Sequence, residues 1–201
     1  MIRRARSISV LAILAAGATS TLAATQTWIH VSLTDGAAAD VAVSGTAAVP
    51  VLTPLSLAVL ALGAALSIIG RVLRIVFGAL TVAAAIGIAV LTAPVAFDVP
   101  VDAYAPSVTE TTGITGDSSV AALVASTSVT GWPVAALVAA VLLLGAGSFV
   151  LVTGWRWPGG GRKYDSPRRR AVVADDAPLD AIDSWDDLSR GDDPTFPDPP
   201  R

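Results

Sequence analysis

Few residues in this sequence have side chains that catalyse reactions or bind metal ions. The chain has no cysteine and a single histidine, His30. Without cysteine there can be no disulfide, thiolate nucleophile or thiolate metal site. A lone histidine without a cluster of carboxylates is a poor general base or metal ligand. We therefore expect no cofactor, no metal site and no enzymatic activity.

One glycine run superficially resembles a phosphate-binding loop. Gly159–Gly161 precede Arg162 and Lys163. A P-loop needs a wider glycine spacing, a serine or threonine after the lysine and a preceding strand, and all three are missing. We interpret this run as a linker.

A cluster of positive charge follows the linker, and it consists of Arg162, Lys163, Arg168, Arg169 and Arg170. Two interpretations stay open. The cluster binds anionic lipid headgroups, at about 1 kcal/mol per charge near a membrane surface, or it only sets the orientation of the chain. The acidic stretch 175–187 would be repelled from the same surface, which would carry the segment around Trp185 into the cytosol.

Four apolar segments must position these residues. They run from about 7–24, 51–69, 72–97 and 132–153, and Arg74 is the one charged residue inside them. Helices of about 20 residues cross a hydrocarbon layer of about 30 Å and satisfy their own backbone hydrogen bonds there. We therefore predict an all-α membrane protein whose residues 1–154 form a bundle of four transmembrane helices. The lack of mid-membrane ionisable residues argues against an ion-coupled transporter.

The distribution of lysine and arginine predicts the topology. All 13 basic residues lie before the first apolar segment, at the turn between the second and third (Arg71, and Arg74 near the start of the third), or after the fourth. The loops 25–50 and 98–131 contain none. Because basic loops remain in the cytoplasm, we predict four crossings of the plasma membrane with both termini cytoplasmic. Cleavage of the first segment as a signal peptide near residues 21–24 is an open alternative, and it would leave the other helices in the same orientation.

The two outer loops differ in character. Residues 28–33 and 40–43 favour strands, and Asp35-Gly36 between them favours a turn, so we predict a small extracellular β-hairpin. The loop 98–131 is expected to cover the bundle irregularly, with residues 118–128 either extending the last helix or forming a short one. Trp28 and Trp132 are expected at the outer membrane boundary.

Small residues in the apolar segments could allow close helix packing. Ala79, Ala83 and Gly87 recur at four-residue spacing, as do Gly63 and Ser67. Such spacing is typical of a helix-packing face. It also arises by chance in alanine-rich segments, and the sequence leaves both interpretations open.

Residues 155–201 are rich in charge and proline, and we predict a disordered cytoplasmic tail. The tail contains the stretches Gly161–Asp165 and Trp185–Thr195. With the four-helix layout and Trp28 after the first helix, these residues resemble the actinobacterial tryptophan-biosynthesis-associated membrane protein family. The resemblance implies association with that pathway, and it implies no catalytic residues.

Two functions remain open. The first is an interaction or scaffold protein whose tail binds a soluble tryptophan-pathway enzyme through Trp185, Leu188, Arg190, Asp192 and Pro194. The second is a transporter or exporter of tryptophan, indole or a related small molecule. Four alanine-rich helices enclose little space, so a transporter would need a homo-oligomer. The candidate partners are therefore the lipid bilayer, a soluble tryptophan-pathway enzyme and further copies of the chain. We expect no binding to nucleic acid.

Overall fold

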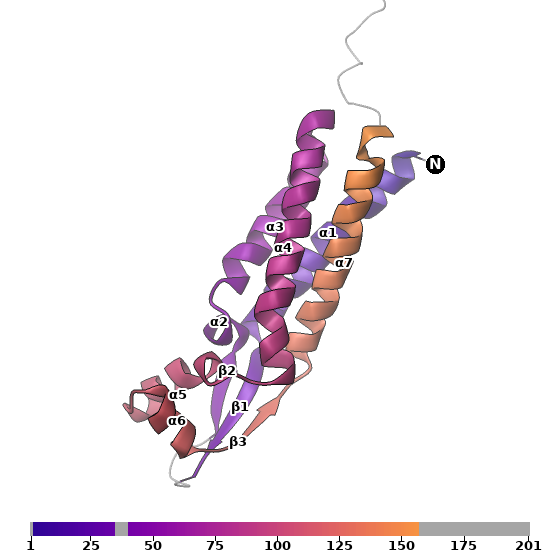
Figure 1. Cartoon of the computed structure of the whole chain (residues 1–201). Helices are drawn as coiled ribbons and strands as arrows, with labels where there is room; N and C mark the ends of the chain where they lie inside the picture. The colour runs from indigo at the N-terminus through magenta and orange to yellow at the C-terminus, as the bar shows by residue number, and fades with distance from the viewer. Residues whose placement is uncertain (1, 35–39, 157–201) are drawn as a thin grey trace, which may run out of the picture. The chain divides into compact units, whose positions relative to one another are not determined.

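The computed structural model describes residues 2–34 and 40–156. Four long apolar helices run alongside one another, and a small sheet with short helices lies at one end of them (Figure 1). The bundle consists of α1 (Ile2–Thr25), α3 (Leu52–Leu66), α4 (Arg71–Phe97) and α7 (Trp132–Thr153). The remaining elements are the strands β1 (Thr27–Leu33), β2 (Val41–Ser44) and β3 (Val124–Val129), the helices α2 (Gly45–Ala48), α5 (Ala105–Thr112) and α6 (Asp117–Leu123), and the 3₁₀ turns η1 (Val101–Ala103) and η2 (Gly154–Arg156).

Three of the four predicted membrane helices have the length and composition to cross a bilayer. They are Arg6–Thr25 of α1, Val72–Phe97 of α4 and Trp132–Thr153 of α7. Helix α3 is apolar but has 15 residues, which corresponds to about 22 Å at about 1.5 Å per residue. The sequence predicted a segment of 51–69, but the chain leaves the helix after Leu66. A crossing by α3 therefore stays a prediction.

The predicted hairpin is part of a larger sheet. Strands β1 and β2 pair antiparallel, with Val31 opposite Val41, as the alternating pattern indicated. On its other side β1 pairs with β3, where Val31 lies opposite Thr127, so the sheet order is β2-β1-β3.

The third strand corrects the description of the chain as all-α and of residues 98–131 as irregular. That loop contains η1, α5, α6 and β3. A short helix does form at Asp117–Leu123, but residues 124–129 continue as a strand. The residues of β3 include the β-branched Val124, Thr127 and Val129, which suit a strand. The free edge of β1 supplies the hydrogen-bonding partners.

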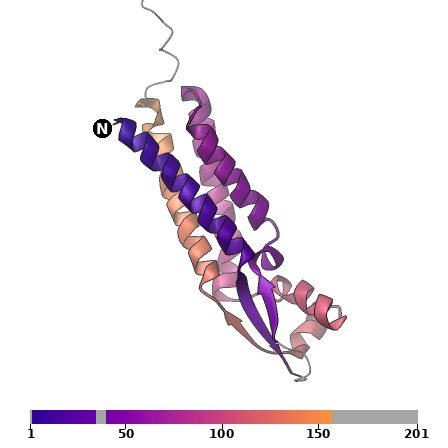
Figure 2. The ribbon, with the colours of Figure 1, turned by 180° about the vertical axis from the view of Figure 1, so that it is seen from behind.

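The helices pack closely at glycines. Gly17 of α1 faces Leu60 of α3, and Gly63 of α3 faces Leu14 of α1. In the other helix pair, a Cβ atom added at Gly147 of α7 would lie 3.4 Å from the carbonyl oxygen of Gly78 in α4. Figure 2 shows α1 lying against α3 and α7.

The small residues whose role the sequence left open differ in their surroundings. Gly63 is buried between helices, whereas Ser67, Ala79 and Ala83 are exposed. At the α4–α7 contact the close approach is at Gly78, which neighbours Ala79 in the sequence, while Gly87 approaches Leu55 of α3.

Two glycines of α7 provide a matched test of this packing. A Cβ atom added at Gly147 would lie 2.9 Å from the Val82 side chain, whereas one added at Gly145 would meet nothing within 4 Å. We expect Gly147→Ala to lower the free energy of unfolding by about 1–3 kcal/mol through overpacking. We expect Gly145→Ala to raise it by about 0.5–1 kcal/mol, because alanine is the better helix former. Unfolding by SDS in mixed micelles measures both changes, and equal stabilities would contradict the packing.

Trp28 connects the bundle to the sheet. Its side chain is fully buried, and its indole N–H donates a hydrogen bond of 2.7 Å to the carbonyl oxygen of Ala23 in the last turn of α1. Gly45 lies so close that an added Cβ atom would be 2.6 Å from the ring. The expected position of Trp28 at the outer membrane boundary stays a prediction: its ring is buried within the protein, and the end of α1 supplies its polar partner.

Candidate functional site

The residues that the sequence singled out for binding lie outside the described part of the chain. They are the partner-binding candidates Trp185, Leu188, Arg190, Asp192 and Pro194, and the lipid-binding candidates Arg162, Lys163, Arg168, Arg169 and Arg170. The described residues show the surface from which this tail begins and the groups that hold that surface together.

The two ends of the bundle carry opposite charge. We call the end where α1 and α4 begin and α7 finishes the basic end, and the opposite end the sheet end (Figure 1). All basic residues in 2–34 and 40–156 lie at the basic end: Arg3, Arg4, Arg6, Arg71, Arg74 and Arg156. The described acidic residues all belong to the sheet end: Asp40, Asp98, Asp102, Glu110 and Asp117. The described chain finishes in η2 at the basic end, so the tail begins there.

Arg74 holds three helices together at the basic end. It is fully buried in the first turn of α4, and no other charged side chain is fully buried among those whose exposure the structure describes. Its Nη1 donates to the carbonyl oxygen of Gly154, at the end of α7, over 3.2 Å. Its Nη2 donates to the carbonyl oxygen of Ile69, just after α3, also over 3.2 Å.

The physical reason for this arrangement lies in the helix ends. The last carbonyl groups of a helix have no intrahelical donor and carry partial negative charge. The planar guanidinium of Arg74 has several donors in a fixed geometry, so one side chain can reach two chain ends. A second arginine adds to this, because Arg6 of α1 donates to the carbonyl oxygen of Ser67. The origin of the tail is thus bonded to the turn between α3 and α4.

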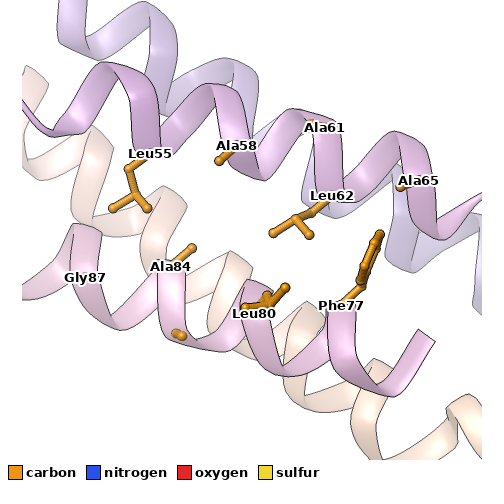
Figure 3. Close-up of a pocket in the computed structure, with 10 residues that line it drawn as sticks. Leu55, Ala58, Ala61, Leu62, Ala65, Phe77, Leu80, Ala84 and Gly87 are labelled. Carbon is orange, nitrogen blue, oxygen red and sulfur yellow. The ribbon is translucent and has the colours of Figure 1, made fainter. Parts of the chain in front are cut away.

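A groove opens between α3 and α4. It has a volume of about 670 Å³. Its lining consists of the hydrocarbon side chains of alanine, leucine and phenylalanine, together with the backbone at one glycine. Leu55, Ala58 and Leu62 of α3 lie on one wall, and Phe77, Leu80 and Ala84 of α4 lie on the other (Figure 3). With no polar side chain, the groove offers only van der Waals contact to hydrocarbon.

The structure also places the one histidine. His30 is exposed in β1, opposite Ala42 on one side and Ser128 on the other, as expected for the hairpin. Within the described ranges, no group of three or more His, Cys, Asp or Glu side chains is arranged to hold a metal ion.

Sequence reasoning missed the role of Arg74, although a signal was present. It is the single basic residue within an apolar segment, and a charge at that depth calls for specific partners. Its partners include backbone carbonyl groups, one of them 80 residues away at Gly154, and carbonyl groups leave no pattern in the sequence.

Long apolar helices, a small sheet at one end and basic residues at the other define this chain as a helical membrane protein. The chain belongs to the tryptophan-associated transmembrane protein family, whose model matches residues 10–195. This match confirms the resemblance found in the sequence, and it includes the tail segment Trp185–Thr195. No curated protein and no solved structure matches the chain.

Proposed function

We propose that this protein is a membrane anchor that presents its tail to a soluble partner in the cytoplasm. The observation that carries the proposal is the separation of charge between the two ends of the bundle. Basic residues resist translocation across the bilayer, and the tail begins at the end where all described basic residues lie. The sheet end, with only acidic charge, would then face outward.

The family name supports a partner in tryptophan metabolism, and the tail sequence supports a binding segment. Trp185 and Leu188 are large apolar residues in an otherwise acidic, proline-rich stretch. Tryptophan is among the residues that most often dominate binding energy at interfaces. Arg190, Asp192 and Pro194 follow within the matched region. We infer that this segment binds an enzyme of tryptophan biosynthesis, while the cluster from Arg162 to Arg170 contacts anionic lipid.

The packing of the bundle favours an anchor over a transporter of tryptophan or indole. Glycine contacts bring α1 against α3 and α4 against α7. Hydroxyl groups such as those of Ser20 and Thr92 are buried in the interior. Among the described residues, no carboxylate is buried there.

The topology is tested with reporters fused to the full chain. A reporter that is active only outside the cytoplasm is expected to be active after Glu110, in α5, and inactive at the C-terminus. A reporter that needs the cytoplasm is expected to show the reverse. Cytoplasmic activity after Glu110 would contradict the topology.

The binding function is tested by crosslinking in native membranes, purification of the full chain and identification of the proteins that accompany it. We expect at least one soluble tryptophan-pathway enzyme, and its loss on Trp185→Ala. Trp155→Ala is the matched control, because Trp155 is a 62% exposed tryptophan at the end of α7 and outside the binding segment. An unchanged set of proteins on Trp185→Ala would contradict the proposal.

A further inference from the structure

A second cavity, of about 260 Å³, lies at the sheet end. The last turns of α4 form one wall, with Val90, Leu91 and Pro94. The turn before α3, at Pro50, and η1, with Asp102, form the others. The cavity is separate from the apolar groove between α3 and α4, and unlike that groove it includes a charged side chain.

The one polar side chain of this cavity is a hydrogen-bond acceptor, and a backbone acceptor lies beside it. Asp102 contributes a carboxylate, and its side chain is exposed. Pro94 lies inside α4 and has no N–H, so the carbonyl group of Val90 lacks its regular helical partner. The remaining lining side chains belong to alanine, valine, leucine and proline and contain no donor. A ligand that bonds to these two acceptors must therefore bring the donors itself, and the remaining lining suits an apolar body.

The chain segment that delivers Asp102 is strained. Val99 has φ of 26°, in a region that β-branched residues rarely adopt. This turn folds the chain back from the end of α4, so that Asp102 reaches the same cavity as Pro94. Strained residues persist where the surrounding structure holds them, and they cluster at ligand sites.

The electrostatic environment selects the sign of the ligand. Each described charged residue of the sheet end is acidic, and Asp102 lies in the cavity itself. Such a field attracts cations and repels anions.

We propose that this cavity binds a primary ammonium ion with a compact apolar body. The ammonium group donates to the carboxylate of Asp102 and to the carbonyl oxygen of Val90, and three donors on one nitrogen suit two acceptors. The apolar body packs against Leu91, Pro50 and Pro94. The binding chemistry does not depend on the proposed topology; only access from outside the cell does.

Calorimetry on the full chain in detergent micelles tests the proposal, with phenethylamine as the probe. Its neutral analogue 2-phenylethanol and the carboxylate 3-phenylpropionate are the comparison ligands. We expect saturable binding of the amine, at least tenfold tighter than that of the alcohol, and no binding of the carboxylate. Absence of saturable amine binding, or equal affinities for amine and alcohol, would overturn the proposal.

Three variants assign the binding to this cavity. Asp102→Asn is expected to weaken amine binding at least tenfold. The heat that remains with this variant measures partition of the amine into micelles. Pro94→Ala restores a helical donor to the carbonyl of Val90, without threatening the fold, and is expected to weaken binding several-fold. Glu110→Gln removes an exposed charge of the same end, outside the cavity, and should leave affinity unchanged. Equal loss in Asp102→Asn and Glu110→Gln would reduce the effect to general surface charge and overturn the site.

Discussion

Trp28→Ala is expected to cost about 3–5 kcal/mol of folding free energy, the range for removing a large buried aromatic side chain. The ring is fully buried, and its loss leaves a cavity where the sheet meets α1. It also leaves the carbonyl oxygen of Ala23 without its 2.7 Å hydrogen bond from the indole. The same junction continues to α7, because the N–H of Thr130 donates to the carbonyl oxygen of Trp28 over 2.8 Å.

Unfolding of the full chain by SDS in mixed micelles, followed by circular dichroism, measures this loss. Trp155→Ala is the control and is expected to change stability by no more than about 0.5 kcal/mol, because Trp155 is exposed. Gly45→Ala should also destabilise, since its Cβ atom would lie 2.6 Å from the ring. That effect should shrink in the Trp28→Ala background, because the two residues are in contact. A Trp28→Ala protein as stable as the control would refute this account of the junction.

Arg74→Met is expected to cost about 2–5 kcal/mol. Methionine fills much of the same space, but the buried carbonyl oxygen of Gly154 and the partly buried one of Ile69 would each lose a donor. An unsatisfied buried polar group costs about 1–3 kcal/mol. Arg74→Lys should lose less, because an ammonium group can donate to a carbonyl but does not reproduce the guanidinium fork.

The order of stabilities is therefore wild type, then Arg74→Lys, then Arg74→Met. Arg6→Met is the comparison at the same end: Arg6 is only partly buried and donates to the carbonyl oxygen of Ser67, so its loss should cost less. Protease sensitivity of the tail's origin after Trp155 provides a second readout, and it should rise in Arg74→Met. Equal stabilities of wild type and Arg74→Met would show that Arg74 does not hold the basic end together.

Much of the fold follows from properties that can be read along the chain. The length of the apolar runs predicted α1, α4 and α7, because a helix must bury an uninterrupted apolar surface to cross a bilayer. Alternation of apolar and polar residues predicted β1 and β2. The tail stretches 161–165 and 185–195 indicated the family, which the match over residues 10–195 confirms.

Other features depended on residues far apart in the sequence. The strand β3 forms because β1 offers an edge about 95 residues earlier in the chain, as in the pair of Ser32 with Ser126. Of the glycines in the apolar segments, Gly147 is at a tight contact and Gly145 is not, and only the position of α4 separates them. The shared cavity of Pro94 and Asp102 likewise needs the reversal at Val99.

Apolar length and the placement of charge therefore determined, from the chain alone, the three helices of membrane length and which end of the bundle is basic. Both are properties summed over neighbouring residues, and the free energy of transferring a segment into lipid depends on that sum. The third strand, the burial of Trp28 and the bonding of Arg74 were decided only when the elements packed together. Each depends on which backbone groups and surfaces meet, and that geometry is not contained in any local stretch of residues.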